Sequence, residues 1–328
     1  MKILHHPAFN QWQSQFSSSL FWRNKLKQSL LSFCGLLVFA LCWQLASSQV
    51  QTSLGQFPGP TQAAAQWSQL VDEYQAEQRR EQAFYQRQQQ RHAALLAADP
   101  HAELPSLPYR ARPTFFSQIL TSLQTVLTGF VLASLIAIPL GILIGLSSNL
   151  YQVFNPLIQL FKPISPLAWL PLVTLIVSSV DLSSVWGSRS FVVSVCTVML
   201  CSLWPTLLNT AVGVSQVPQD LLNVSKVLRL SWWRHLRIIV LPSAVPMIFT
   251  GLRLSLGIAW MVLIAAEMLA QNPGLGKFVW DEFQNGSSDS LSRICVAVLV
   301  IGLLGFVLDR LMLMLQRKVN WDKTAVSR

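Results

Sequence analysis

Four ionisable residues stand inside long apolar stretches of the sequence: Arg253, Glu267, Asp309 and Arg310. A charge at membrane depth is costly, so such residues are candidates for an ion pathway by default. Arg253 and Glu267 are 14 positions apart, about 21 Å along a straight helix, and cannot pair with each other. We expect Asp309 to meet Arg253 across a helix bundle, as a structural ion pair or as a gate. Arg253 and Glu267 are pathway candidates, although Glu267 can instead lie exposed at the outer mouth, and Arg310 can extend to the inner interface.

The sequence offers no catalytic constellation. Its histidines stand in tails or loops and its cysteines inside apolar stretches, and neither set has the spacing of metal ligands. The segment GLGKF at 274–278 lacks the first glycine and the final Ser or Thr of a phosphate-binding loop. We therefore expect no catalytic residue, no metal and no cofactor, and we expect the protein not to be an enzyme. If ATP drives it, a separate subunit carries the hydrolysis.

Membrane helices are needed to position these residues. The chain has 328 residues, of which 52% are hydrophobic and only 12% charged, against about 25% charged in a soluble domain. Apolar stretches of about 18 residues or more predict transmembrane helices, since a backbone in lipid must satisfy its own hydrogen bonds. Six such stretches predict an all-α membrane protein with six transmembrane helices, at about residues 30–47, 119–146, 163–180, 191–212, 243–270 and 294–315.

The first apolar stretch follows a charged leader. This arrangement fits either an anchoring helix or a cleaved signal peptide, with LASSQ at 45–49 as the cleavage site. The apolar run is long for a signal peptide, and its length favours the anchor.

Lys and Arg are concentrated on one side of the predicted membrane helices. The N-terminal arm, the loops after the second and fourth stretches and the C-terminal tail carry 13 basic residues against two acidic ones. Lys162 is assigned here to the loop after the second stretch. Short loops rich in Lys and Arg face the cytoplasm, so we expect both termini inside and the chain in a bacterial inner membrane. The same distribution accounts for the net charge of +10 and argues against a nucleic-acid partner.

The segment 49–112 is expected outside the cytoplasm. Prolines flank a middle part that has no Pro or Gly and is rich in helix formers. Trp67, Leu70, Val71 and Tyr74 give its first turns one apolar face, and the later turns are polar all round. Two interpretations stay open, a platform for a soluble partner outside the membrane and a solvated helical insertion near the surface.

The segment FNPLIQLFKPISPLAWLPL at 154–172 contains four prolines, so it cannot be a regular helix throughout. Irregular backbone at membrane depth must be buried in protein or line a cavity. An interrupted helix of this kind favours an ion path, and Ser165, Trp169 and Thr174 are its candidate pathway residues. The preceding stretch contains GILIG at 141–145, a small-xxx-small pattern that permits close helix contact.

A basic and aromatic segment, the predicted coupling loop at 217–242, separates the fourth and fifth stretches. It carries four Lys or Arg and two adjacent tryptophans. Ser231 is placed to cap a second short helix. We expect a helix-turn-helix at the cytoplasmic face, whose apolar side, ringed by cations, fits a groove on another protein or lies on anionic lipid. The apolar side recurs at helical spacing and consists of Leu221, Val224, Leu228 and Trp232.

The end of this segment, IVLP at 239–242, resembles the cytoplasmic coupling motif of binding-protein-dependent ABC importer permeases, E-A-A-x3-G-x9-I-x-L-P. NVS at 223–225 stands where that motif has E-A-A. Arg229 stands where it has glycine, at the turn between the two short helices. The resemblance implies that the segment couples to an ATPase through Asn223, Val224, Ser225, Lys226, Leu228, Arg229, Trp232 and Pro242.

Four longer segments are similar to the nitrate and nitrite branch of these permeases, which is related to the bicarbonate, taurine and sulfonate permeases. They read PLIQLFKPISPLAWLPLV, NVSKVLRLS, PMIFTGLRLSLGIAWMVLIAAEML and GLGKFVWDEFQNG, within about residues 115–318. The resemblance implies a type I ABC importer permease fold and a pore of two permease chains, as a homodimer. It also implies ABC ATPase subunits on the coupling loops, a periplasmic or lipid-tethered binding protein that delivers the anion, and alternating access between two states.

These expectations divide the chain into a cytoplasmic arm (1–29), a first transmembrane helix (30–48), an extracytoplasmic, partly helical insertion (49–112), a five-helix permease core (113–316) with its coupling loop (217–242), and a cytoplasmic tail (317–328). The expected function is the pore subunit of an ATP-driven importer for nitrate or nitrite, embedded in membrane lipid. Bicarbonate, cyanate, taurine or a sulfonate are alternative substrates. A non-transporting membrane scaffold or assembly protein is the alternative of another class.

Overall fold

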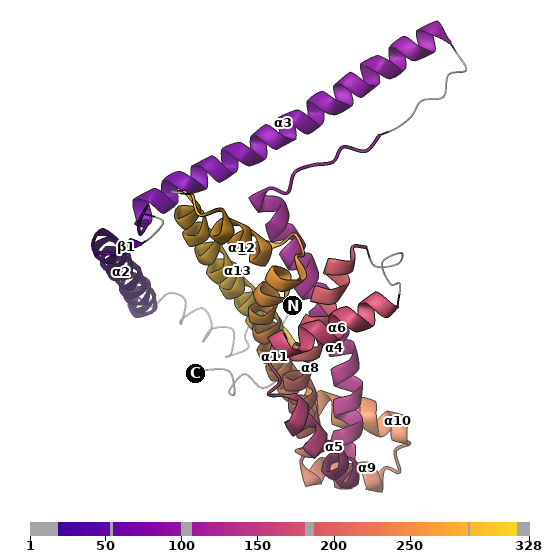
Figure 1. Ribbon diagram of the computed structural model, residues 1–328. Coiled ribbons are helices and arrows are strands. Elements are labelled where there is room, and N and C mark those ends of the chain that lie inside the picture. The colour runs from indigo at the N-terminus through magenta and orange to yellow at the C-terminus, as the bar shows by residue number, and fades with distance from the viewer. Residues whose placement is uncertain (1–18, 53–54, 100–106, 181–186, 288, 320–328) are drawn as a thin grey trace, which may run out of the picture.

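The computed structural model describes residues 19–52, 55–99, 107–180, 187–287 and 289–319 (Figure 1). Most of the expected N-terminal arm and C-terminal tail therefore lies outside the described residues. The architecture is helical, as predicted, apart from a short antiparallel pairing of β1 (Gln51–Thr52) with β2 (Gly55–Gln56).

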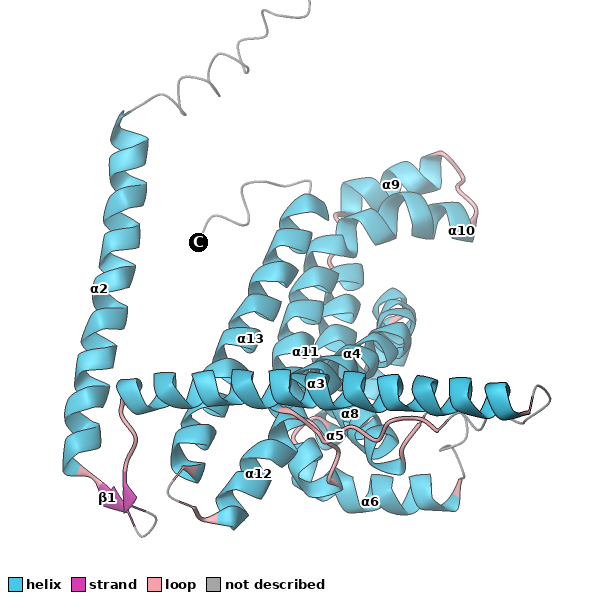
Figure 2. Cartoon of the chain, turned by 90° about the horizontal axis from the view of Figure 1, so that it is seen from above, coloured by secondary structure: helices cyan, strands magenta, loops and turns pink. Residues whose placement is uncertain are grey.

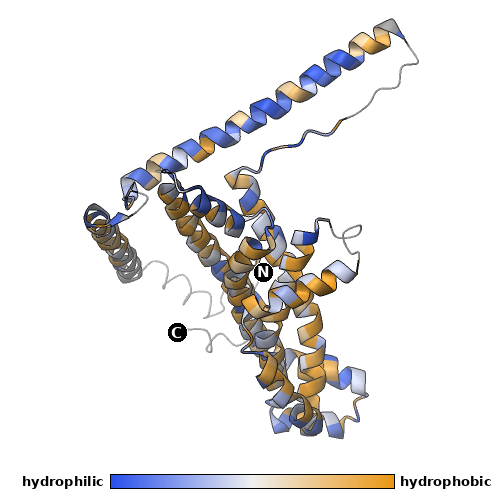
Figure 3. Cartoon of the chain, in the orientation of Figure 1, coloured by the Kyte–Doolittle hydropathy of each residue, from blue (hydrophilic) through white to orange (hydrophobic). Residues whose placement is uncertain are grey.

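Among the described residues, four helices are long and apolar enough to cross a membrane. They occupy the second, fourth, fifth and sixth predicted stretches and are mostly hydrophobic along their length (Figure 3). Their high apolar content explains why they form as helices, because only a helix satisfies its backbone within one segment in lipid. They are α4 (Phe115–Leu146), α8 (Arg189–Ser215), α11 (Leu241–Ala270) and α13 (Ser290–Val319).

The third predicted stretch, 163–180, does not form one straight span. It holds α6 (Pro166–Ser179), which is bent by 99° relative to the preceding α5 (Ser148–Phe161), so the two form either a broken span or a re-entrant loop. Proline disfavours the helical conformation for the residue before it. Ser165 is accordingly extended, with a ψ of 143°, and α6 begins directly after it, whereas α5 already ends at Phe161.

The first predicted stretch is occupied by α2 (Ser19–Gln49), whose apolar part, Phe33–Gln49, is shorter than a full membrane span. α2 stands apart from α4, α8, α11 and α13 (Figure 2). Within the described residues, the apolar helices give four spans, or five if α5 and α6 count as one. The count of six stays a prediction.

Helix α8 packs between α4 and α11 at backbone contact distance. A Cβ added at Gly141 would lie 2.7 Å from the carbonyl oxygen of Leu207, and one added at Gly145 would lie 2.5 Å from that of Ala211. Small residues allow such close approach in membranes, where apolar side chains gain little from leaving lipid. The small-xxx-small pattern in α4 therefore serves helix packing, as expected.

The hydroxyl group of Ser255 in α11 inserts into the backbone hydrogen-bond pattern of α8. Pro205 has no N–H to donate, and next to it the N–H of Thr206 donates to Oγ of Ser255 at 3.1 Å. Ser255 Oγ in turn donates to the carbonyl oxygen of Ser202 at 2.5 Å. Insertion of a side chain into a helix ladder is a recognised cause of local bending. This buried contact fixes the register of α8 against α11.

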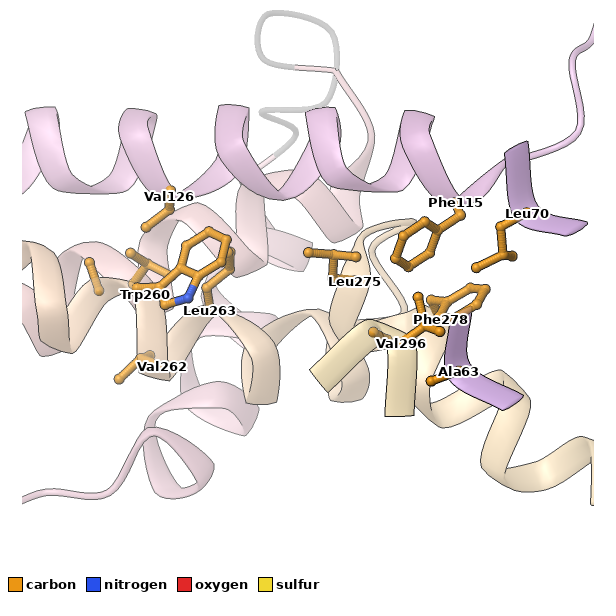
Figure 4. Packing of buried hydrophobic residues seen from close by; sticks show 13 residues of the cluster. Ala63, Leu70, Phe115, Val126, Trp260, Val262, Leu263, Leu275, Phe278 and Val296 are labelled. Atoms are coloured by element: carbon orange, nitrogen blue, oxygen red, sulfur yellow. The ribbon is translucent and has the colours of Figure 1, made fainter. Parts of the chain in front are cut away.

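A hydrophobic cluster joins six helices of the bundle (Figure 4). It packs α3 (Pro60–Ala98) and α12 (Leu275–Asn285) against α4, α8, α11 and α13. Phe115 and Phe278 pack against each other within it, with ring centroids 4.9 Å apart. The members that Figure 4 labels are Ala63, Leu70, Phe115, Val126, Trp260, Val262, Leu263, Leu275, Phe278 and Val296.

The long helix α3 (Pro60–Ala98) crosses the direction of the membrane-type helices (Figure 2). Its first turns use the predicted apolar face, with Leu70 buried and the ring of Trp67 5.5 Å from that of Phe116. Arg293 at the start of α13 pairs with Glu73 on α3 and, at 2.9 Å, with Glu282 on α12. These contacts hold the first half of α3 on the bundle.

The second half of α3 extends beyond the bundle and is accompanied by the returning segment 107–114 (Figure 1). Glu77 accepts hydrogen bonds from the backbone N–H of Arg112 and the hydroxyl of Tyr109, both at 2.9 Å. These hydrogen bonds hold the pKa of Glu77 below its ordinary value, and the bond from the backbone N–H of Arg112 has the larger effect. Phe84 also packs against Tyr109, and Gln88 donates to the carbonyl of Leu107. The rest of the projecting part is mostly polar and exposed, so the structure favours neither earlier interpretation of the insertion.

The contact of Gly145 with α8 gives a stability prediction. In Gly145→Ala the new methyl group meets the backbone of Ala211 and the Cβ of Val214, neither of which can rotate away. We expect a loss of about 1–3 kcal/mol of unfolding free energy, measured by thermal unfolding in detergent. Gly302→Ala in α13 is the control, since its Cβ meets nothing within 4 Å and should leave stability equal or higher by roughly 0.5–1 kcal/mol. Equal behaviour of the two variants would contradict the packing account.

Candidate coupling and translocation sites

A helical hairpin joins α8 to α11. Its arms are α9 (Gln219–Val227) and α10 (Trp232–His235), and we call residues 219–235 the coupling hairpin. The predicted helix-turn-helix is confirmed, with Ser231 at the N-cap position of α10. The buried Ser225 ties the two arms together through a 2.8 Å hydrogen bond between its Oγ and Nδ1 of His235.

The turn of the hairpin explains the position at which the sequence has arginine in place of glycine. Arg229 adopts a φ of 46°, in the left-handed region that favours glycine. The N–H of Leu230 donates to the carbonyl of Ser225, and the N–H of Arg229 donates to that of Lys226, both at 3.1 Å. This pair of bonds defines a Schellman helix ending, which places a left-handed residue directly after the helix. The turn therefore forms with arginine, which lacks the conformational freedom of glycine.

The coupling hairpin presents apolar side chains that nothing covers among the described residues. Val227 is 81% exposed and Trp233 is 68% exposed, and Arg229 stands between them in the sequence. Contiguous exposed apolar surface with a polar rim is typical of an interaction site. The exposed apolar set is Leu221, Val224, Val227, Leu228, Trp232, Trp233 and Ile238, and the exposed cations and amide are Asn223, Lys226, Arg229, Arg234 and Arg237.

The second arm of the coupling hairpin continues directly into α11. A five-residue π-helical turn, Leu236–Val240, links them, and the N–H of Leu241 donates to the carbonyl of Leu236. A wider turn of this kind accommodates Pro242, which cannot donate a hydrogen bond. α11 begins at Leu241, within two residues of the predicted start of the span at 243, but the helix runs unbroken from Trp232 to Ala270.

A cavity of about 500 Å³ lies between the coupling hairpin and the neighbouring ends of α4 and α8. Its walls include Tyr151 at the start of α5, Gln216 at the end of α8 and His235 in the hairpin. The hairpin is thus anchored through α8 and α11 and leaves space behind it.

The break between α5 and α6 holds the residues predicted for an ion path. Ser165 caps α6, its Oγ accepting from the N–H of Leu167 at 3.3 Å, and Thr174 donates to the carbonyl of Leu170 in its own helix. Trp169 stacks on Phe161, with ring centroids 6.0 Å apart. Thr174 is thus occupied within α6, whereas Trp169 faces the junction of α5 and α6.

Trp204 in α8 completes this aromatic group and was missed by the sequence analysis. Its ring lies parallel to that of Phe161, with centroids 6.2 Å apart and an interplanar angle of 4°. A tryptophan in an apolar span carries no local sequence signal, so only the packing of α5 on α8 identifies it.

Lys162 is not in a loop at the end of the bundle, which corrects the sequence prediction. It ends α5, which returns alongside α4 and packs Ile158 against Ala133 and Ala137. Its neighbour Phe161 stacks on Trp204, about halfway along α8. Lys162 therefore lies at the middle level of the bundle, because the prolines of this segment bend the chain inside the bundle.

Arg253 and Asp309 form the predicted ion pair between α11 and α13. Nε of Arg253 lies 2.6 Å from Oδ1 of Asp309, and the second hydrogen bond, to Oδ2, measures 3.0 Å. The two side chains are 39% and 40% exposed, so the pair lies on an outward face of the single chain. Structural and gating roles both stay open. Arg310 lies over the ring of Phe306, 4.9 Å from its centroid.

Glu267 is completely buried, and the expectation that it can lie exposed at the outer mouth is wrong. Ser122 Oγ lies 2.7 and 2.9 Å from its two carboxyl oxygens, and the N–H of Gly276 donates to Oε2 at 3.0 Å. α12 folds back over the end of α11, and a Cβ at Gly274 would collide with the Glu267 carboxyl group. The glycines of GLGKF therefore make room for a buried acid, a tertiary contact that the sequence did not reveal.

Comparison with known proteins identifies relatives over most of the chain. Residues 137–321 match the family described as binding-protein-dependent transport system inner membrane component. The bicarbonate transport system permease protein CmpB of Synechococcus elongatus is 35% identical over 90% of this chain and 91% of its own length. The nitrate import permease protein NrtB of Leptolyngbya laminosa is 38% identical over 63% and 70%. The taurine transport system permease protein TauC of Escherichia coli is 30% identical over 63% and 70%.

Solved structures support the fold. An inward-facing conformation of the MetNI methionine ABC transporter matches with a TM-score of 0.54 and 13% identity. The match covers 63% of this chain and 96% of that one. At this identity the likeness concerns the arrangement of the helices alone, which is the type I importer permease fold.

The left-handed Arg229 gives a test of the hairpin turn. Arg229→Gly removes a conformational cost of about 1 kcal/mol, so exchange of the Leu230 amide hydrogen should slow roughly fivefold, as measured by hydrogen–deuterium exchange. Arg234→Gly is the matched control. It places glycine inside a helix, which destabilises that helix, so amide exchange in α10 should become faster by a similar factor. Faster exchange of the Leu230 amide in Arg229→Gly would show that the stability of the turn does not depend on a left-handed conformation at residue 229.

Proposed function

We propose that this chain, which belongs to the family of binding-protein-dependent transport system inner membrane components, is the pore-forming subunit of an ATP-driven importer for a small inorganic anion. The observation that carries the proposal is the exposed apolar face of the coupling hairpin, at the position of the family's coupling motif. Hydrolysis of ATP is assigned to separate ABC ATPase subunits. The family makes a non-transporting scaffold the weaker candidate.

The coupling hairpin is suited to transmit movement from an ATPase. Its apolar face, including Val224, Leu228 and Trp232, fits a groove on a partner protein. The second arm continues into α11 without a break, so displacement of the hairpin moves the whole helix. Through Ser255 the movement reaches α8. The cavity behind the hairpin provides room for this displacement.

The remaining assembly follows from the same proposal. The hairpin end of the bundle faces the cytoplasm of a bacterial cell, and the end with α3 and α12 faces outward. A second copy of the chain completes the pore, and a periplasmic or lipid-tethered binding protein delivers the anion to the outer end. Ser165 and Trp169 at the break in α5–α6, with Arg253 on the outward face of α11, are the proposed pathway residues. Glu267 is left with a packing role, since both of its oxygens are engaged inside the chain.

Nitrate or nitrite is the first candidate substrate, supported by the similarity of the chain to nitrate import permeases. Bicarbonate is the second candidate, and the length of the match to bicarbonate permeases supports it. Nitrate, nitrite and bicarbonate are all small planar oxyanions with a single negative charge. Transport follows from alternating access: ATP-driven closure of the ATPases draws the hairpins together, and the pore changes between inward- and outward-facing states.

Replacement of two apolar hairpin residues tests the coupling role. Val224→Asp with Leu228→Asp places two carboxylates in the proposed contact, and burying them unpaired should reduce the co-purified ATPase roughly tenfold or more. The matched control is Gln82→Asp with Gln86→Asp, four residues apart on the exposed part of α3. Undiminished co-purification of the ATPase with the hairpin variant would refute the coupling role.

Uptake measurements test the substrate. Proteoliposomes that contain the chain with its ATPase and binding-protein subunits should take up nitrate in an ATP-dependent manner, and the hairpin variant should not. Bicarbonate and taurine are measured alongside. Robust taurine uptake without nitrate, nitrite or bicarbonate uptake would overturn the assignment to a small inorganic anion.

A further inference from the structure

Lys162 is a positive charge at the middle level of the bundle. It is exposed on the single chain, and the described residues offer it no ion-pair partner. The acid of α13 at a comparable depth, Asp309, is already engaged by Arg253. A charged group at membrane depth faces a water-filled space or a partner group, because contact with lipid is costly. Lys162 therefore needs a counter-ion or water that the described residues do not supply.

Two indole groups that pack on Phe161, the residue before Lys162, have a related deficit. Nε1 of Trp169 and Nε1 of Trp204 are both buried and have no hydrogen-bond acceptor among the described residues. An indole N–H is a donor only, and leaving it unsatisfied costs free energy. Both rings stack against Phe161, the residue directly before Lys162.

Two other tryptophans, Trp43 and Trp260, do not share this property. Nε1 of Trp260 donates to the carbonyl of Ile301 at 3.1 Å, and Nε1 of Trp43 donates to the carbonyl of Pro58 at 3.1 Å. The two unmet indole donors thus both belong to rings that stack on Phe161, directly before an unpaired cation. The two N–H groups lack an acceptor and Lys162 lacks a counter-ion among the described residues, and one anion supplies both.

We propose that the break between α5 and α6 is an anion-binding station on the translocation path, formed by the ammonium group of Lys162 and the indole N–H groups of Trp169 and Trp204. The ligand is a small oxyanion of single charge. It presents several acceptor oxygens to several donors, and one ammonium group balances one negative charge. A doubly charged anion leaves one charge unbalanced at membrane depth, which is costly. The inference rests on the proposed function and adds the residues that recognise the transported anion.

The arrangement also connects binding to movement. The three donors come from the break itself, from α6 and from α8, so an anion that engages all of them draws these elements together. α8 is joined to α11 through Ser255, and α11 continues from the coupling hairpin. Rearrangement of the hairpin therefore changes the geometry of the station, and release of the anion follows from separation of the donors.

Uptake by the complete importer in proteoliposomes tests this station, with nitrate, bicarbonate and sulfate as probes. Lys162→Gln should raise the KM for nitrate or bicarbonate about tenfold or more, the range expected for loss of a charge-assisted hydrogen bond. Lys162→Arg keeps the charge and should stay within about threefold of the wild type. Trp169→Phe and Trp204→Phe keep the rings and remove one donor each, so KM should rise about two- to tenfold. Sulfate should be carried poorly by every variant.

Matched controls separate this inference from effects on folding. Trp260→Phe removes an indole N–H that already has a partner, and Lys277→Gln removes a lysine that is paired with Asp281 in α12; neither should change KM. Wild-type KM values in folded Lys162→Gln would overturn the inference and leave the proposed function standing. Equal impairment of folded Lys162→Arg and Lys162→Gln would also overturn it, because the charge would then not matter. If the wild type carries none of the anions, the proposed function and the inference fall together.

Discussion

The close contact of α8 with α4 and α11 is the constraint on which the rest of the structure depends. Apolar side chains gain little by leaving lipid for another helix, so helices in a membrane associate through close packing and hydrogen bonds. Gly141 and Gly145 bring α4 to the backbone of α8, and Ser255 of α11 replaces a missing bond in its ladder. These contacts are too short to tolerate added atoms. They turn three helices into one unit, against which α5, α6, α12 and α13 are placed.

Function follows from what this unit connects. At one end the coupling hairpin projects an apolar, cation-rimmed face and continues without interruption into α11. At the middle level, the break in α5–α6 brings Phe161 against Trp204 of α8. At the other end, the buried carboxyl group of Glu267 joins α4, α11 and the returning α12 through Ser122 and Gly276. In the proposed function, a movement imposed on the hairpin is transmitted along these helices to the proposed anion path, while packing holds the far end in place.

Sequence reasoning was successful where the determining physics is local. Apolar length located the membrane helices, and the spacing of Leu221, Val224 and Leu228 with Ser231 at a cap position predicted the hairpin. It failed where tertiary contacts decide. The burial of Glu267 depends on α12 folding back, and the level of Lys162 depends on α5 returning along α4. Pro242 was taken to end the loop, whereas a widened turn absorbs it. The pathway residues and the ATPase-contact residues remain predictions, because the single chain contains neither the second permease copy nor the ATPase.

Photocrosslinking from Val227, the most exposed of the hairpin's apolar residues at 81%, tests the central claim most directly. A photoreactive amino acid at this position in the assembled importer should crosslink to the ATPase subunit. The same group at Leu303, an exposed apolar residue of α13, should not. Crosslinking of position 227 to lipid alone, with no ATPase adduct in an importer that hydrolyses ATP, would contradict the account.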